Sequence, residues 1–424
     1  MTDEAADPIA TDRDRRTTDG SSVGKGSTGK SSADTAVTIA IMVIAALAPI
    51  LGALVPRGMA PLLITGTLAI TVAFRLHSGR WPPVRGSWVS VLAAFVALAA
   101  LSLAWSPVPD DGVEQVVQFL ALFGPALLLV AAASRAPAAT HAGRLLLVAF
   151  VAGTALLVLE LAAGLPLHNL VRGRLALDGD PTELNRNLVV MAALVWPAML
   201  VPWLRGRRLL ALLLPLGLAI PVAWGESQSA QIGIPAGLAV LAAATAAPEW
   251  TRRALMALTV LAFVGIMPFV AQLHAVALDS EILPFSARHR LEIWNFTSER
   301  IAEKPLLGWG IEASRELGAS RISEDLGGGA ELMPLHPHNA FLQVWLELGA
   351  VGAAISLAIL LLLLHGIGKL RPAAKAPAMA AYAAGMAMIA VSYGIWQSWW
   401  LSALLLTAAL IVACARPAEV QPRP

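Results

Sequence analysis

Long apolar stretches, separated by shorter polar ones, run through the chain from Ala36 to Ala413. A helix needs about 20 mainly apolar residues to cross a bilayer. Twelve stretches approach that length, at 36–54, 60–74, 88–105, 115–133, 145–164, 188–204, 209–224, 230–247, 254–273, 339–365, 378–395 and 396–414. Only the short YGIWQSWW turn separates the last two, so an eleven-span count is an alternative. The pattern predicts an all-α polytopic integral membrane protein with about 12 transmembrane helices.

Composition supports this fold class, because 57% of residues are hydrophobic and 14% are charged. Soluble domains have roughly 45–50% and about 25%. The first 35 residues differ, being rich in Asp, Arg, Ser, Thr and Gly. We expect residues 1–35 to form a disordered cytoplasmic tail, and residues 415–424 to form a second, short cytoplasmic tail.

A P-loop-like pattern, GKGSTGKS, lies in that first tail at Gly24–Ser31. A functional P-loop follows a strand and opens a helix, so that backbone N–H groups surround the phosphate. No strand is predicted before Gly24. We therefore expect no nucleotide site here.

Basic residues are distributed unevenly between the two ends of the predicted spans. The short loops on one side carry 13 Lys and Arg residues, and those on the other carry four: Arg57, Arg172, Arg174 and Arg186. Because cytoplasmic loops are enriched in these residues, we place both termini in the cytoplasm. Two outer segments then stand out, a polar connection at about 165–187 and a long loop at 274–338.

The long loop divides the chain into transmembrane helices 1–9 (36–273), a periplasmic loop domain (274–338) and transmembrane helices 10–12 (339–414). Loops of this length are usually functional or disordered. Its SARHRLEIWNFTSERIAEKP stretch predicts a helix, ended by Pro305, with Leu291, Trp294 and Ile301 on one side. The loop has six basic and ten acidic residues. This balance argues against a general anion-attracting surface and for a few placed arginines. No nucleic-acid partner is expected.

His338, at the start of the tenth predicted span, is a candidate base. A neutral imidazole can take a proton from a hydroxyl near neutral pH, and a helix N-terminus favours that neutral form. An ordinary interfacial histidine is the alternative. A metal site would need three or four ligands, and the acids near His336 and His338, Asp325 and Glu331, are interpreted as ordinary loop residues. No metal site is expected.

Arg288, Arg290 and Arg300 in the loop helix have two interpretations. They can pair with Glu292, Glu299 and Glu303 on a solvated face, which suits the Arg300–Glu303 spacing of three. Alternatively, they can hold phosphate, since guanidinium groups are permanently charged and bidentate. Arginines and a histidine at one membrane face indicate a phosphorylated lipid head group that meets a hydroxyl acceptor.

Two stretches, RLEIWNFTSERIAEKPLLGWG and HPHNAFLQVWLELGAVG, resemble the outer loop and following span of the O-antigen ligase-like membrane protein family. The matching positions are Arg290, Trp294, Pro305, Gly308, Gly310, His338, Asn339, Gln343, Glu347, Gly349 and Gly352. The ligase-type signature falls on His338, Asn339, Gly349 and Gly352. The close resemblance covers about 290–352.

The resemblance implies a glycosyltransferase that needs neither nucleotide nor metal. The donor would be an undecaprenyl pyrophosphate-linked glycan in the outer leaflet of the inner membrane, and the acceptor a hydroxyl such as one of lipid A core. His338 would act on that hydroxyl and Arg290 would contact the pyrophosphate. Membrane lipids are the other expected partners. The paired glycines would allow close helix packing, and Glu347 would either bond a neighbouring helix or serve the site.

One departure concerns a second arginine, which family members carry in an S-x-S-R stretch. The corresponding GESQSAQIG, Gly225–Gly233, has none. Arg186 is our first choice to supply that charge, with Arg174 and Arg172 next, while Gln228 and Gln231 could donate hydrogen bonds. The predicted substrate-binding residues are Arg186, Arg174, Arg288, Asn339, Trp294 and Gln228.

Three other functions remain open at this point. A polysaccharide polymerase of the same family would use a growing glycan as acceptor, but the outer arginines lack the arginine–ten residues–glycine spacing that polymerases tend to show. A polysaccharide or lipid-linked sugar transporter would place charge inside several spans, whereas this chain keeps nearly all its charge outside them. A structural partner of an envelope assembly would give His338 and Arg290 no role.

Overall fold

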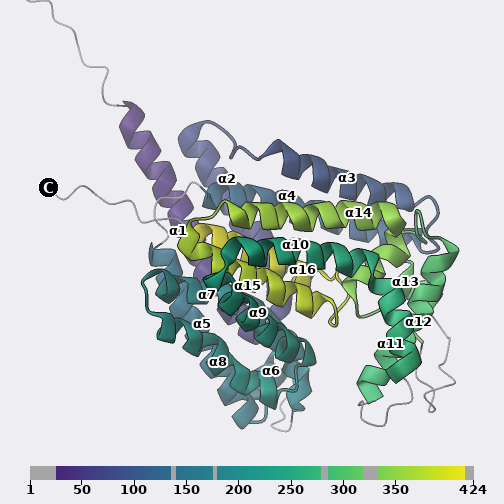
Figure 1. Ribbon diagram of the computed structural model, residues 1–424. Helices are drawn as coiled ribbons and strands as arrows, with labels where there is room; N and C mark the ends of the chain where they lie inside the picture. The colour runs from purple at the N-terminus through teal and green to yellow at the C-terminus, as the bar shows by residue number, and fades with distance from the viewer. Residues whose placement is uncertain are drawn as a thin grey trace, which may run out of the picture.

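The computed structural model describes residues 25–134, 140–174, 179–277, 285–318, 332–333 and 335–415, and every regular element in these ranges is a helix (Figure 1). The elements are α1 (Lys25–Leu54), η1 (Pro56–Gly58), α2 (Met59–Ser78), α3 (Gly86–Ser102), α4 (Pro109–Ala133), α5 (Thr140–Ala162), α6 (Pro166–Val171), η2 (Pro181–Leu184), α7 (Asn185–Leu204), α8 (Arg208–Trp224), α9 (Gln228–Ala246), α10 (Pro248–Val264), α11 (Ile266–Ala277), α12 (Phe285–Glu303), α13 (Ser314–Leu317), α14 (Ala340–Gly368), α15 (Pro372–Ile389) and α16 (Ser398–Cys414).

Each of the twelve predicted spans coincides with helical structure, and the protein is a polytopic helical membrane protein. Within the described ranges, seven helices are long and apolar enough to cross a bilayer, or eight if the bent pair α10–α11 is one span. The same ranges contain three shorter apolar helices, α3, α8 and α16. The exact number of spans therefore stays a prediction, as does the placement of the loops relative to the membrane.

The ninth predicted span is not one straight helix, which corrects the prediction for 254–273. α10 and α11 meet at a 69° bend. Gly265 lies between them and Pro268 falls in the first turn of α11, where proline is tolerated because its missing N–H has no partner there. The Trp345 indole N–H donates to the Phe263 carbonyl at 2.9 Å, which satisfies a group exposed near the bend.

The predicted tails lie largely outside the described ranges. Residues 1–24 and 416–424 are among those left out, but α1 begins at Lys25, inside the segment predicted as a tail. The prediction used the length of the apolar stretch, which marks the part of a helix that can lie in lipid. It does not detect a polar extension of the same helix. Residues 25–31 of the P-loop-like pattern are thus helical, rather than a loop between a strand and a helix.

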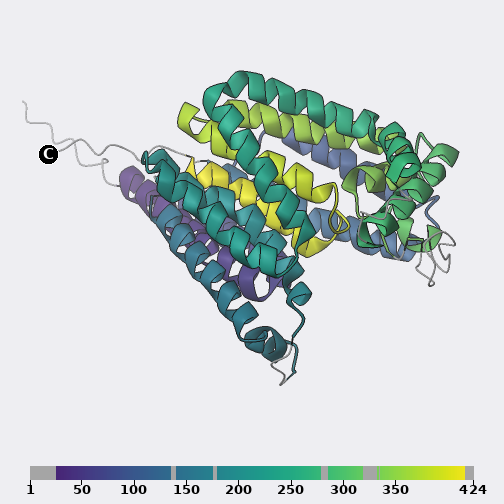
Figure 2. The same ribbon diagram turned by 60° about the horizontal axis from the view of Figure 1, so that its bottom comes forward.

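α7 is the centre of the helical bundle. In the apolar segment Pro181–Leu204, 89% of an 18-residue stretch is buried inside the protein. α7 packs against α1, α5, α8, α15 and α16. Glycine allows the close packing of another pair, α9 and α15, because a β-carbon on Gly233 of α9 would lie 2.5 Å from Met388 of α15. α12 and α13 lie at the end of the bundle away from the start of α1, as both views show (Figures 1 and 2).

Candidate functional site

A break in α14 shapes the region around the predicted base. Gly349 has φ of 62° and ψ of −160°, which interrupts the helical hydrogen-bond ladder. The Pro305–Gly310 turn closes this break. Trp309 and Gly310 donate their N–H groups to the carbonyls of Leu346 and Glu347, each at 2.8 Å. In return, the Ala350 N–H donates to the Pro305 carbonyl at 2.9 Å.

Glycine is required on both sides of this junction. A β-carbon on Gly349 would lie 2.4 Å from the Leu306 carbonyl carbon, and one on Gly308 would lie 2.5 Å from that of Glu347. Both residues also have positive φ. Gly308 and Gly349 therefore allow a turn to join a broken helix. For Gly349 this is a more specific role than the close helix packing predicted for it and Gly352.

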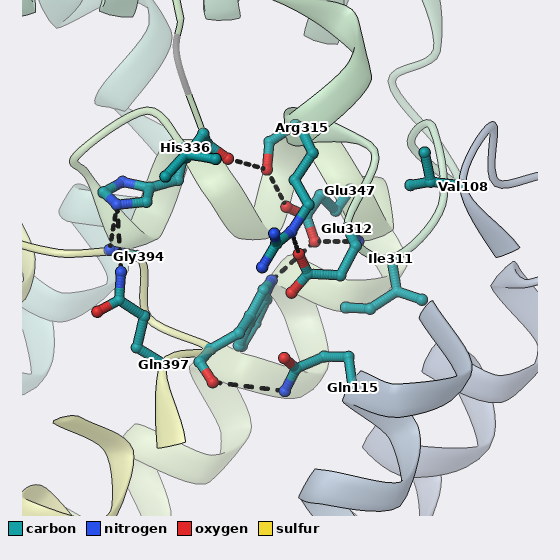
Figure 3. A network of polar contacts seen from close by, with 12 residues as sticks. Val108, Gln115, Ile311, Glu312, Arg315, His336, Glu347, Gly394 and Gln397 are labelled. Carbon is teal, nitrogen blue, oxygen red and sulfur yellow. Dashed lines mark hydrogen bonds and ion pairs between the residues drawn. The ribbon is translucent and has the colours of Figure 1, made fainter. Parts of the chain in front are cut away.

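Glu347, fully buried in α14, ties three segments together (Figure 3). Its two oxygens accept hydrogen bonds from the Glu312 N–H at 2.8 Å, the Ser314 hydroxyl at 2.7 Å, the Gln343 amide at 3.1 Å and the Trp396 indole at 2.7 Å. Four donors satisfy both carboxylate oxygens, as a buried charge requires. Of the two predicted roles for Glu347, the structure supports the hydrogen-bonding one.

The loop between α15 and α16, residues 390–397, is held against α14 by further bonds. The Ile395 N–H donates to the Gln343 side-chain oxygen at 3.0 Å, and the Gly394 N–H faces His336 Nε2 at 3.2 Å. The predicted span 378–395 is wrong at this end, because α15 stops at Ile389. Its last six residues form a loop that takes part in the site.

His338 is oriented by that loop. Its Nδ1 lies 3.1 Å from the Ser392 carbonyl. A carbonyl can only accept, so Nδ1 carries the proton and the lone pair of the neutral ring is on Nε2. No described residue bonds Nε2. The structure thus presents His338 as a neutral histidine with a free basic nitrogen.

Burial lowers the pKa of His338 from 6.5 to about 4, and the positive charge of Arg290 contributes to the same effect. The bond to Ser392 opposes them. The prediction of a neutral imidazole is consistent with this direction, but burial and the Arg290 charge are the causes. His336 is more deeply buried, and burial lowers its pKa to about 3.

Arg290 lies near His338 and has no acidic partner among the described residues. Its Nη1 donates to the Gln228 side-chain oxygen at 2.9 Å, and the Gln228 amide donates to the Ser286 hydroxyl at 3.3 Å. Two of the acids considered as partners for the loop arginines bond elsewhere: Glu292 contacts His274 at 3.1 Å, and Glu299 accepts from the Asn295 amide at 3.0 Å. Arg290 therefore keeps its charge unneutralised, while burial lowers the pKa of its guanidinium.

Two predicted substrate-binding residues use their polar groups to hold the site together. The Trp294 indole donates to the Pro337 carbonyl at 2.9 Å, which fixes the chain just before His338. The Asn339 side-chain oxygen accepts from the N–H groups of Phe341 and Leu342 at 3.0 and 3.1 Å, and so caps α14. For both residues, substrate contact stays a prediction.

A cavity of about 320 Å³ lies beside His336. Its wall includes Arg186, the first choice for the missing second arginine, together with Arg57 and Arg315. The Arg186 guanidinium lies 5.9 Å from the ring centres of both Tyr393 and Trp399. Burial raises the pKa of Tyr393, and the charges of Arg186 and Arg290 oppose that rise, so both arginines lie near this ring.

The other predicted arginines do not join this group. Arg172 and Arg174 both pair with Glu183, and the Arg174 side chain is 57% exposed. Arg300 pairs with Glu303 at 2.7 Å, as its spacing predicts. Arg288 lies on α12, and its buried Nε has no hydrogen-bond partner among the described residues. Asp325 and Glu331, considered as metal ligands, lie outside the described ranges.

Several residues of the site were not predicted. Ser392 contributes a backbone carbonyl, which no side-chain pattern can reveal. Arg57 and Arg315 resemble ordinary loop arginines in the sequence. Tyr393 and Trp396 offered the one usable signal, because an aromatic-rich turn with Gly394 between two apolar stretches is unusual for a plain connection.

Comparison with known proteins supports the resemblance drawn from the motifs. Residues 210–357, from α8 into α14, match the family described as O-antigen ligase. Two proteins named "Putative polysaccharide ligase" match as well. One from Rickettsia conorii is 36% identical over 135 residues, and one from Rickettsia felis is 28% identical over 246 residues.

These matches cover parts of the proteins. The Rickettsia conorii match takes in 31% of this chain and 33% of the relative, and the Rickettsia felis match 55% and 59%. The family match includes Gln228, Arg290, His338 and Gly349, but it excludes Arg57, Arg186 and the 390–397 loop. The resemblance to the O-antigen ligase-like family is confirmed, and it rests on the half of the site that holds Arg290 and His338.

Proposed function

We propose that this O-antigen ligase-like protein is a membrane glycosyltransferase of the ligase type. It transfers a glycan from an undecaprenyl pyrophosphate carrier to an acceptor hydroxyl, such as one of lipid A core. The reaction takes place at the periplasmic face of the bacterial inner membrane. The observation that carries the proposal is that His338, with its free Nε2, lies near Arg290, with its unneutralised charge.

In the proposed reaction, the acceptor oxygen attacks the first carbon of the glycan and forms the new glycosidic bond. The bond from that carbon to the phosphate oxygen breaks, and the carrier pyrophosphate leaves with the electron pair. The acceptor proton passes to Nε2 of His338. Charge develops on the pyrophosphate as it leaves, and a positioned guanidinium stabilises such charge. Arg290 supplies that guanidinium, with Gln228 holding it in place.

The neutral state of His338 suits this role. Arg290 and burial keep the ring unprotonated before the donor binds. The donor pyrophosphate would bring negative charge to the same place, which offsets Arg290 and makes Nε2 more basic. The base would therefore strengthen when its substrate is present.

The test uses purified protein in liposomes with undecaprenyl pyrophosphate-linked glycan as donor and lipid A core as acceptor. We expect His338→Ala and Arg290→Gln each to reduce transfer by about 100-fold or more, the usual scale of loss for a general base or a charge-stabilising donor. Arg300→Gln, in the same helix as Arg290, and His365→Ala, near the other end of α14, are the matched controls and should keep wild-type rates.

Two outcomes would reject the proposal. Wild-type transfer by His338→Ala would remove the proposed base. Transfer that lengthens the carrier-linked glycan and ignores lipid A core would assign the protein as a polymerase, the close alternative within this family.

A further inference from the structure

The cavity beside His336 has chemistry that the proposed donor site does not use. Its wall holds three arginines, Arg57, Arg186 and Arg315, and one acidic residue, Glu312. Figure 3 shows Glu312 paired with Arg315, close to Glu347. Burial raises the pKa of Glu312, which further limits its negative charge. The cavity is therefore positively charged.

Arg57 and Arg186 carry most of this excess charge. Neither has an acidic partner among the residues that the structure describes, and Arg186 instead lies over two aromatic rings. A surface arginine without an acid is unremarkable. Two of them in the wall of one cavity, with a third arginine nearby, favour an anionic ligand, since a guanidinium binds phosphate and carboxylate through paired donors.

Most other polar groups in the wall are already occupied. The amides of Gln115 and Gln118 donate to the Trp396 carbonyl. The oxygen of Gln397 accepts from the Trp399 indole at 2.8 Å. The wall offers a ligand guanidinium groups and the aromatic side chains of Trp396 and Trp399. Aromatic rings offer flat apolar area at little entropic cost, which suits the C–H face of a sugar ring.

The cavity is next to the proposed base and distinct from the donor contacts. Its wall includes His336, whose ring centre lies 4.3 Å from that of His338. Arg290 and Gln228 are not part of the wall. A volume of about 320 Å³ is near the lower end of the roughly 300–1,000 Å³ typical of small-ligand sites.

We infer that this cavity is the acceptor site and that it takes a sugar bearing a phosphate or a carboxylate. The inference rests on the proposed transferase function and adds the class of acceptor to it. The anionic group lies against Arg57 and Arg186, the sugar ring lies against the tryptophans, and the reacting hydroxyl is directed to His338. Arg57, Arg186, Trp396 and Trp399 all fall outside residues 210–357, the part matched to the family. A subsite specific to the acceptor of this protein need not be shared with the family.

Binding without donor tests the cavity alone. Calorimetry on the full-length protein in detergent would compare glucose 6-phosphate, glucuronic acid, glucose and inorganic phosphate. We expect at least one anionic sugar to bind about tenfold or more tightly than glucose and than inorganic phosphate. The double substitution Arg57→Gln with Arg186→Gln should remove this preference. Arg205→Gln with Arg207→Gln, which removes the same charge beyond the other end of α7, should retain it.

Equal binding of glucose and both anionic sugars would overturn the inference. Binding of inorganic phosphate as tight as that of glucose 6-phosphate would overturn its sugar component, because the site would then recognise the anion alone. An equal loss in the Arg205 and Arg207 control would show a general charge effect and would also overturn it.

Transfer kinetics separate this inference from the proposed function. In the Arg57 and Arg186 double variant, we expect KM for an anionic acceptor to rise about tenfold or more, with KM for the donor within about twofold. A rise in donor KM alone would overturn the acceptor assignment and leave the transferase proposal intact. Undiminished transfer by His338→Ala would instead reject the transferase proposal, whatever the binding results.

Discussion

Two segments of the chain carry arginines beyond the ends of the predicted spans. An acidic partner neutralises the arginines of one segment, whereas Arg290 in the other has none among the described residues. Around α12, Arg290 is partly buried and bonded to the neutral amide of Gln228. Around α6 and η2, Arg172 and Arg174 are exposed and share the carboxylate of Glu183. The two segments lie well apart in both views (Figures 1 and 2). The same residue type thus keeps its charge available in one segment and has it neutralised in the other.

The difference arises from what surrounds each arginine. α12 is fixed by Trp294, whose indole donates to the Pro337 carbonyl, and by the turn that closes the break in α14, whose Trp309 indole donates to the Arg300 carbonyl. Such a framework can hold a charge without a counter-ion. The α6 segment is also held by buried bonds, since Glu160 accepts from the N–H groups of Leu167 and His168. Its arginines differ in having a carboxylate within reach, because the partly buried Glu183 contacts both of them. The absence of a neighbouring acid among the described residues therefore distinguishes Arg290 from these two arginines.

Gly349→Ala should have the largest effect, because it removes the junction that builds the first segment. The backbone conformation of Gly349 is one that essentially only glycine adopts. Holding an alanine in it would cost about 1–3 kcal/mol of folding free energy. The new β-carbon would also meet the Leu306 carbonyl carbon at 2.4 Å. We expect loss of most folded protein, measured by size-exclusion chromatography and thermal unfolding in detergent.

Gly366→Ala is the matched control for this change. Gly366 lies in the same helix, its β-carbon would meet nothing within 4 Å, and alanine is the better helix former. This variant should fold as well as the wild type. Equal behaviour of the two variants would show that the break in α14 does not organise the site.

The predicted helices could be placed well from the sequence, because the length of an apolar stretch is a local property. The breaks at Gly265 and Gly349 could not, since each depends on a partner that satisfies the exposed backbone groups: Trp345 in one case and the Pro305–Gly310 turn in the other. A glycine in an apolar stretch is equally compatible with close packing and with a break. Only the distant segment decides between them.

For the candidate site, sequence motifs identified His338 and Arg290 but not the group that orients the histidine. That group is a backbone carbonyl of Ser392, brought in by a loop 54 residues further along the chain. Arg186 was singled out to supply the charge that family members carry and that this chain lacks at Gly225–Gly233, and it lies in the cavity wall near Tyr393. Arg57 was counted only as an outer loop residue, because nothing local distinguishes it.

A change of pH should have a smaller effect on kcat/KM. This experiment tests whether His338 is as buried as the structure shows. A histidine with the ordinary pKa of about 6.5 would lose roughly tenfold of its neutral form between pH 7.5 and 5.5. Burial and Arg290 lower the pKa of His338 to about 4, so the neutral base persists through this range. We expect kcat/KM to change less than about twofold over this range. The fall of kcat in acid should begin at a higher pH than the fall of kcat/KM, because bound pyrophosphate raises the pKa of His338.

Unfolding must be monitored at each pH of this experiment. His336 has a folded-state pKa of about 3, below its value of about 6.5 in the unfolded chain. The unfolded state therefore binds more protons in acid, and stability falls as pH drops below about 6.5, by up to roughly 1.4 kcal/mol per pH unit for one such group. A tenfold fall in kcat/KM at pH 5.5 with an unchanged melting temperature would contradict the buried, neutral state of His338.

The smallest effect should come from the second segment, where Arg172→Gln with Arg174→Gln removes two charges near the candidate site in sequence but not in contact with it. Exposed ion pairs contribute about 0–1 kcal/mol each, and the Arg174 side chain is 57% exposed. We expect glycan transfer within about twofold of wild type and a melting temperature close to it, against the loss expected for Arg290→Gln measured in the same liposomes. A large loss of transfer in this double variant would mean that substrate reaches both segments at once. The arginines neutralised by Glu183 would then have to exchange that partner for the glycan or its carrier, and exposure in the unliganded protein would no longer distinguish a functional arginine from an ordinary one.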